Sequence, residues 1–219
     1  LRAGDQVNVR EVGSAAMVAA DFPHVHLIAS PENLGFTGGN NVALHWLGLP
    51  VCTACAVAAP PRVAPVDFVL LLNPDAVVSV EDVRLLQAAL LAEPDVASVG
   101  PAQVDAAGAR ARVGWPFPSP VGTWLEAVGL ARLRPASEFV IGSVLLVRAE
   151  ALEQLGGLDE RFFLYAEETD WAYRASLLGW RHREVPEVTA VHLDVGALRQ
   201  VVPDSLVFCW GLANADTPW

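Results

Sequence analysis

Phe68-Val69-Leu70-Leu71-Leu72-Asn73-Pro74-Asp75 is the stretch of this sequence that decides the fold. Five consecutive apolar residues are typical of a strand that is buried on both faces, as in a parallel sheet covered by helices. The proline removes a backbone donor and ends strand pairing, so Asp75 follows the carboxyl end of the strand. Open α/β sheets bind their ligands at that end.

Helix and strand signals alternate along the rest of the chain. Ser79, with Asp82 three residues later, is typical of a helix N-terminal cap, and Pro94 ends the expected helix near residue 92. Further elements are expected as strands at 96–99 and 188–193 and as a helix at 169–178. Strands that alternate with helices predict an α/β fold with a mainly parallel, Rossmann-like sheet flanked by helices.

The 219 residues fit a single domain, 1–219, with a sizeable core. Residues 48–66 are rich in Ala, Pro and Val without a period, which predicts an insertion loop. Residues 114–137 carry Trp115, Trp124 and several prolines, and they are expected to form a mobile loop.

The charge balance limits the classes of partner. With 25 acidic and 14 basic residues, the net charge of −11 excludes a nucleic-acid binder, which needs a basic face. An acidic protein still binds an anionic nucleotide when a divalent cation lies between carboxylates and phosphates. Three cysteines exclude a disulfide scaffold. No membrane span or signal peptide is predicted, so a cytoplasmic location is expected.

Asp75 and His192 are candidate ligands of a metal ion. The carboxylate of Asp75 suits Mg²⁺ or Mn²⁺, which prefer oxygen ligands and share them with phosphates. Asn-Pro-Asp is also favourable turn chemistry, and spacing alone leaves the two interpretations even. His192 is either a metal ligand or a buried, hydrogen-bonded histidine, and the latter is commoner for a lone histidine.

Glu167, Glu168 and Asp170 form an acidic cluster behind the apolar stretch 162–166. They fall at the start of a helix, where the helix dipole favours negative charge, so capping is the structural alternative. Apolar surroundings would raise the pKa of a carboxylate and make it a better general base.

The glycine-rich loop Asn33–Asn41 precedes a helical stretch at 42–47. It is neither a Walker loop nor a dinucleotide fingerprint. Glycines ahead of a helix let backbone amides approach a phosphate or a base, although this signal is weak by itself.

Several motifs follow one another in a regular order over most of residues 30–193. They are ENLGFTGGNN at 32–41, LLNPD at 71–75, VGP at 99–101, GS at 142–143, LVR at 146–148, GGLDERFFLY at 156–165, EETDW at 167–171, and His192. In this combination the chain resembles the family 2 inverting glycosyltransferases of the GT-A fold, in particular the rhamnosyltransferase-like members.

The resemblance implies a role for each candidate residue. Asp75 would hold Mg²⁺ or Mn²⁺, since Asn73-Pro74-Asp75 occupies the place of the family's Asp-x-Asp motif, and His192 would complete the metal site. Glu168 falls where the family has its catalytic Asp, with Glu167 and Asp170 beside it. The nucleotide pocket would be lined by Asn33, Gly35, Gly38, Asn40, Asn73 and Asp75.

The resemblance also implies the reaction. The enzyme would move a sugar, by resemblance rhamnose, from a dTDP- or UDP-sugar to a saccharide or lipid-linked acceptor with inversion, in cell-surface polysaccharide synthesis. A lipid-linked acceptor would bring the protein to the inner face of the membrane as a peripheral protein. The alternative is a catalytically impaired relic that binds nucleotide or saccharide without turnover.

Compared with the family pattern, the chain is expected to be truncated at both ends. Only residues 1–20 stand where the family has a strand, a helix and a second strand, so the first strand–helix unit is expected to be incomplete. Beyond Gly196 the acceptor-side helices common in the family are expected to be missing.

Overall fold

The computed structural model of the chain describes residues 19–20, 22–23, 25–30, 33–51, 65–134, 137–193 and the backbone of 208–212. The first strand–helix unit, expected within residues 1–20, and most of the insertion loop expected at 48–66 therefore lie outside the described residues. No helix in the described ranges combines the length and the apolar character that crossing a bilayer requires.

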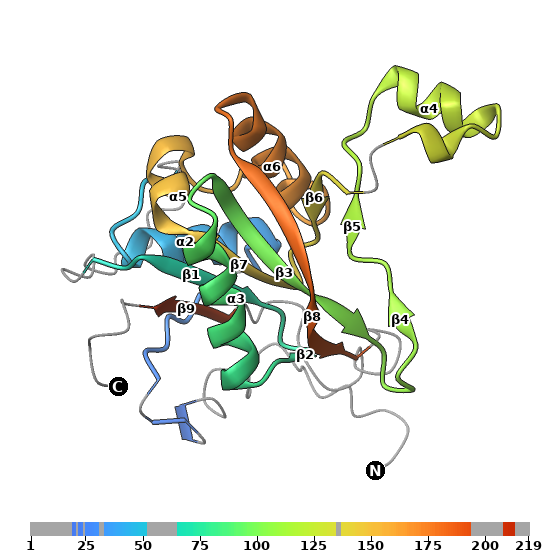
Figure 1. Cartoon of the computed structure of the whole chain (residues 1–219). Helices are drawn as coiled ribbons and strands as arrows, with labels where there is room; N and C mark the ends of the chain where they lie inside the picture. The colour runs from blue at the N-terminus through green and yellow to red at the C-terminus, as the bar shows by residue number, and fades with distance from the viewer. Residues whose placement is uncertain are drawn as a thin grey trace, which may run out of the picture.

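Helices and strands follow one another as Figure 1 shows. The helices are α2 (Gly35–Trp46), α3 (Val80–Ala92), α4 (Pro120–Ala127), α5 (Ala149–Leu155) and α6 (Glu167–Leu177), with a 3₁₀ turn η2 (Ala131–Leu133). The strands are β1 (Phe68–Leu72), β2 (Ala76–Val77), β3 (Val96–Val104), β4 (Arg110–Ala111), β5 (Gly114–Trp115), β6 (Phe139–Val140), β7 (Val144–Arg148), β8 (Arg181–His192) and β9 (Phe208–Leu212).

The main sheet has the strand order β2-β8-β3-β7-β1-β9, with β4 paired to β3, while β5 and β6 form a separate pair. β7 runs antiparallel to both β1 and β3, and β8 runs parallel to β3. β1, β3 and β8 therefore point in the same direction. We call the edge at which they end, at Leu72, Val104 and His192, the carboxyl edge.

The α/β class is confirmed, but the expectation of a mainly parallel sheet is wrong. Among the described strands, β3 and β8 form the one parallel pair, and the remaining pairs of the main sheet are antiparallel. The reason is that a continuous apolar run reports burial on both faces of a sheet, and says nothing about the direction of the neighbouring strand. β7 is as buried as β1, yet it runs the opposite way between β1 and β3.

The apolar run of β1 contributes to a hydrophobic core on each face of the sheet. Val69 and Leu71 belong to the core that α2, α5 and α6 cover. Phe68 and Leu70 belong to the core on the α3 side. Burial of each such side chain contributes roughly 1.5–3 kcal/mol, so the run holds both helical layers on the sheet.

The helix expected after Ser79 is confirmed as α3. Ser79 Oγ accepts a hydrogen bond from the backbone N–H of Asp82 at 3.0 Å, which satisfies one of the free amides of the first turn. α3 ends at Ala92, two residues before Pro94. The helix expected at 169–178 begins two residues earlier, because α6 starts at Glu167.

Residues 114–137 contain more regular structure than the expected loop. α4 and η2 lie away from the main sheet, at the end of a projecting segment (Figure 1). Ser119 caps α4 by accepting from the backbone N–H of Gly122 at 3.0 Å. Arg134 pairs with Glu126 and donates to the Phe117 carbonyl, so polar contacts close the segment on itself.

The last strands are longer and more numerous than the sequence predicts. β8 begins at Arg181, and a register shift opposite Pro101 and Ala102 leaves residues 186–188 without a partner on β3, which accommodates Pro186 inside the strand. β9 then pairs with β1. The apolar pattern of 188–193 reveals only the end of β8.

Candidate functional site

Asp75 and His192 meet at the carboxyl edge. Asn73-Pro74-Asp75 forms a turn closed by a hydrogen bond of 3.0 Å from the Ala76 N–H to the Asn73 carbonyl. Ala76 pairs with His192 across β2 and β8, which brings His192 Nε2 to 3.3 Å from Asp75 Oδ1. The turn and the ligand-site interpretations of this motif are therefore compatible, because the turn is what places Asp75 beside His192.

The polar atoms of this pair fit a divalent metal ion. Asp75 is 8% exposed, and the buried His192 Nε2 has no hydrogen-bond partner among the described residues. A buried polar atom without a partner is costly, so its retention indicates a ligand. The described residues hold no group of three or more His, Cys, Asp or Glu side chains that could bind an ion. A single carboxylate such as Asp75 nevertheless suits Mg²⁺, which is commonly bound by one or two carboxylates together with substrate phosphates.

A strained turn leads into α6. Tyr165 and Ala166 have φ values of 71° and 73°, in the left-handed region that residues with a Cβ adopt at a cost of about 1–2 kcal/mol each. The backbone reverses here, so that Tyr165 is 75% exposed whereas Glu167 is 3% exposed. The turn thus converts an exposed loop into a helix whose first carboxylate is buried.

Burial raises the pKa of Glu167 to about 7. The negative charge of Glu168 adds to this effect, while backbone amides of Glu167 and Tyr165 oppose it. Glu167 Oε2 has no hydrogen-bond partner within the described part of the chain. The carboxyl group is therefore partly protonated at neutral pH.

Burial also raises the pKa of Glu168, against the opposing effect of the backbone amides of Glu168 and Gly142. The Glu168 side chain lines a small apolar cavity together with Leu145, Leu152 and Trp171. The apolar surroundings that the sequence predicts are thus those of the core rather than of the stretch 162–166, where Phe163 is exposed. Unlike Glu167, Glu168 retains partial exposure.

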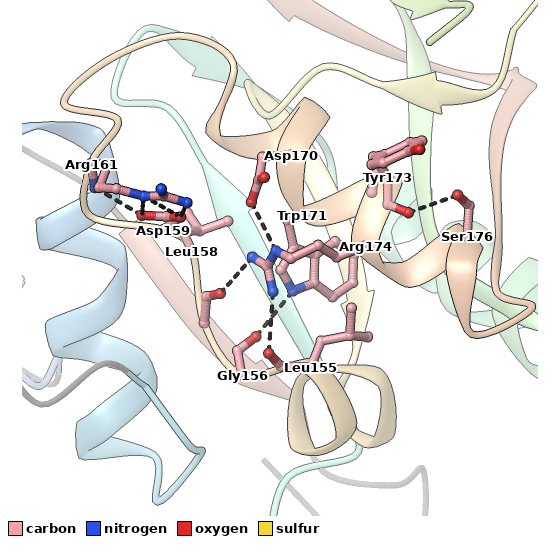
Figure 2. A network of polar contacts seen from close by, with 12 residues as sticks. Leu155, Gly156, Leu158, Asp159, Arg161, Asp170, Trp171, Tyr173, Arg174 and Ser176 are labelled. Carbon is pink, nitrogen blue, oxygen red and sulfur yellow. Dashed lines mark hydrogen bonds and ion pairs between the residues drawn. The ribbon is translucent and has the colours of Figure 1, made fainter.

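Asp170 is engaged in a different contact. Figure 2 shows its carboxylate bonded to Arg174, at 2.8 Å between Oδ2 and Nε. Arg174 also donates to the carbonyls of Leu155 and Gly157, which ties α6 to the end of α5. The i,i+4 pair therefore organises the helix start, and among the described residues Glu167 and Glu168 are the carboxylates of this cluster without an ion pair.

The glycine-rich segment Asn33–Asn41 is helical from Gly35 onward, so the expectation of a loop is wrong. Asn33 Oδ1 accepts from the Gly35 N–H at 2.9 Å, and Gly35 has a φ of 67°. A Cβ on Gly35 would lie 2.4 Å from the Phe163 carbonyl oxygen. Close packing on the loop before α6 thus outweighs the poor helix propensity of the glycines.

The polar residues of this helix point into the protein. Asn40 is fully buried and donates to the Phe36 carbonyl at 2.9 Å, and Gly38 is buried as well. Asn41 bridges to the backbone of Leu158 through two hydrogen bonds. Asn33 stays exposed, and the pocket-lining role of the set remains a prediction.

The turn Gly142–Ser143 joins the two halves of the site. The Ser143 carbonyl accepts from the Asn73 N–H at 2.9 Å, two residues before Asp75. A Cβ on Gly142 would lie 3.7 Å from the Cβ of Glu168. Gln103, which sequence reasoning missed, binds the Ser143 hydroxyl. The signal in the sequence that could have identified Gln103 is its amide side chain, which lies within the buried strand β3.

Replacement of Glu167 by Gln is expected to stabilise the protein above pH 7. The folded-state pKa of about 7 lies above the unfolded value near 4.5, so the wild type loses free energy of unfolding as the pH rises between these values. The loss amounts to about 3 kcal/mol, and Gln does not incur it. Urea unfolding at pH 5 and pH 8 measures the difference, with Glu153→Gln as an exposed control. An equal pH dependence in Glu167→Gln and the wild type would contradict the burial argument.

Comparison with known proteins shows a similarity in sequence to sugar-transferring enzymes. No protein-family model matches the chain. The chain is 28% identical over 197 residues to N-acetylglucosaminyl-diphospho-decaprenol L-rhamnosyltransferase from Mycobacterium tuberculosis, over 82% of this chain and 62% of that protein. It is 27% identical over 175 residues to a low-salt glycan biosynthesis hexosyltransferase from Haloferax volcanii, over 77% of this chain and 52% of that protein.

This chain thus spans between half and two thirds of the length of these relatives. Among solved structures, a crystal structure of GalNAc-T7 with UDP, GalNAc and Mn²⁺ is similar with a TM-score of 0.49 and 16% identity, over 80% of this chain and 33% of that chain. The sequence similarity covers more than three quarters of the chain and confirms the resemblance inferred from the motifs. The chain is therefore a homologue of glycosyltransferases that act in glycan biosynthesis.

Proposed function

We propose that this protein transfers a sugar from a nucleoside diphosphate sugar to a saccharide or lipid-linked acceptor, with inversion at the anomeric carbon. The observation that carries the proposal is the contact of 3.3 Å between the buried Asp75 and the half-buried His192 at the carboxyl edge, where the buried His192 Nε2 lacks a hydrogen-bond partner among the described residues. Such a reaction needs two parts: side chains that can hold a metal ion, and a carboxylate with a raised pKa that can act as a base.

The donor half of the proposed site lies around Asp75. Asp75 and His192 would hold Mg²⁺ or Mn²⁺, which when bound would neutralise charge on the departing diphosphate. Asn73, at the end of β1, and the exposed Asn33 before α2 are placed toward the nucleotide in this proposal. The donor is a dTDP- or UDP-sugar, with rhamnose as the sugar taken from the resemblance.

Glu168 is the general base of the proposal. Its carboxylate takes the proton of an acceptor hydroxyl, whose oxygen attacks the anomeric carbon on the face opposite the diphosphate. The new glycosidic bond forms as the bond to the diphosphate oxygen breaks, so no covalent enzyme intermediate arises and the configuration inverts. Burial raises the pKa of Glu168 above its ordinary value, which makes its carboxylate a stronger base than that of an exposed glutamate.

The acceptor is proposed by analogy with a relative. The Mycobacterium tuberculosis protein is named for an acceptor that carries N-acetylglucosamine on diphospho-decaprenol. A polyprenyl-linked saccharide is therefore the acceptor class to test first, and it would bring the protein to the inner face of the membrane as a peripheral, cytoplasmic enzyme.

The melting temperature of the chain with UDP-, dTDP- and GDP-sugars, with and without Mn²⁺, tests the donor site. A ligand that binds only the folded state at 100 times its Kd adds about 2.7 kcal/mol of stability, which for this size raises the Tm by roughly 5–10 °C. We expect such a rise with one nucleotide and only when Mn²⁺ is present. A cooperative melt that no donor changes would contradict the proposal and favour the relic without donor binding.

A further inference from the structure

The turn Gly142–Ser143 is the structural connection between the donor half and the base half of the proposed site. On the donor side, the Asn73 N–H donates to the Ser143 carbonyl at 2.9 Å, which holds the chain two residues before Asp75. On the base side, a Cβ on Gly142 would lie 3.7 Å from the Cβ of Glu168, so the turn stands directly against the base of that side chain. A shift of this turn would therefore change where the two halves stand relative to each other.

Gln103 fixes this turn from β3. Its side chain is fully buried, and Nε2 donates to Ser143 Oγ at 2.8 Å. Ser143 Oγ in turn donates to Gln103 Oε1 at 3.0 Å, so both polar atoms of the Gln103 amide are hydrogen-bonded to the Ser143 hydroxyl. Ser143 is itself only 6% exposed, which removes water as a competing partner.

Gln103 also lies beside β8, the strand that carries the candidate metal ligand His192. Gln103 pairs with Ala190 of β8, two residues before His192. β3 is paired on both sides at this point, because Gln103 also pairs with Ala111 of β4. Gln103 thus links the turn Gly142–Ser143 to the part of β8 that carries His192.

We infer that Gln103 is a positioning residue of the proposed transfer reaction: through Ser143 it fixes the turn Gly142–Ser143 and thereby the separation of Asp75 from Glu168. The inference rests on the proposed function. Gln103 is fully buried beneath the turn, so its effect is expected on the alignment of the two halves rather than on the binding of donor or acceptor. Misplacement by about 1 Å is enough to cost about 100-fold in rate.

The test is the double variant Gln103→Met with Ser143→Ala. Met has a similar length and no hydrogen-bond requirement, and replacing both partners by apolar groups avoids an unpaired buried group, so the variant is expected to fold. We expect kcat for transfer from the sugar nucleotide that the melting experiment identifies to fall about 10- to 100-fold. The Kd of the matching nucleoside diphosphate with Mn²⁺, measured by calorimetry, is expected to change less than about 3-fold, which is under 1 kcal/mol.

The matched control is Ser98→Ala, which removes a side-chain hydrogen bond of 2.8 Å from the same strand to His182, without contact to the turn. Its kcat is expected to stay at the wild-type value. Hydrogen exchange gives a readout without turnover: the amides of Asn73 and Gly142 are expected to exchange faster in the double variant and unchanged in the control.

The outcomes separate the inference from the proposed function. A wild type that neither binds a nucleotide nor transfers a sugar overturns both. A wild type that is active, with a double variant of unchanged kcat, overturns only the role of Gln103. Equal losses in kcat and in nucleotide affinity would also overturn it, since they would mean that Gln103 serves the stability of the donor half alone.

Discussion

Sugar transfer by the Glu168→Gln variant is expected to be slower than wild-type transfer by about 10²–10⁴-fold, the usual contribution of a general base. Gln has nearly the same shape but cannot take the proton of the acceptor hydroxyl. The affinity for the donor nucleotide with Mn²⁺ is expected to stay unchanged, because Glu168 lies on the base side of the turn Gly142–Ser143. Initial rates and calorimetric Kd values, measured on the same preparation, test both parts.

The pH dependence of wild-type transfer gives a second check on Glu168. Only the ionised carboxylate accepts a proton, and burial raises its pKa above the ordinary value of 4.5. Activity should therefore fall on acidification at a higher pH than an exposed glutamate would cause, and it should be fully present above the raised pKa. Transfer that survives Glu168→Gln with an unchanged pH profile would move the base to Glu167 or Asp170.

Asp75→Asn is expected to abolish the metal-dependent part of donor binding. The substitution keeps the turn that Asn73 and Ala76 close, but it removes the charge that holds the cation. Loss of a group that only supports a metal ligand typically costs 10- to 100-fold in metal affinity, so loss of the ligand itself should weaken donor binding by at least about 100-fold. Titration of the nucleotide with and without Mn²⁺ measures this change.

Asp67→Asn is the matched control for Asp75→Asn. Asp67 is an exposed carboxylate immediately before β1, at the opposite end of the same strand. The control is expected to bind the donor as the wild type does. A donor affinity in Asp75→Asn that still responds to Mn²⁺ would place the metal ligand elsewhere and leave the Asp75–His192 contact with a structural role alone.

Much of the fold could be predicted from local signals. The apolar run at 68–72 became a strand buried on both faces, and the pair Ser79 and Asp82 became a helix cap, because both depend on residues close in the sequence. Strand direction could not be predicted in this way. It depends on where β7 returns after residues 114–137, and the apolar pattern of β7 is the same for either direction.

The candidate site was predictable as a set of residues, but not as an arrangement. Asp75, Glu168 and His192 stand out by residue type and by their place after strands or before a helix. Their contacts were not predictable, since Asp75 and His192 are 117 positions apart and meet only through the pairing of β2 with β8. The contact of Gln103 was not predictable for the same reason, because its partner Ser143 is 40 residues away in the sequence.

By itself the sequence determined which segments are apolar on both faces, where α3 begins, and which carboxylates and imidazoles are available. Only the tertiary structure decided which of these groups lose water and which find partners. Asp170 is neutralised by Arg174, whereas Glu167 is buried without a partner for Oε2 among the described residues, although the two belong to the same turn of one helix. The difference arises because desolvation and hydrogen bonding depend on what packs against each atom, and those neighbours come from distant parts of the chain.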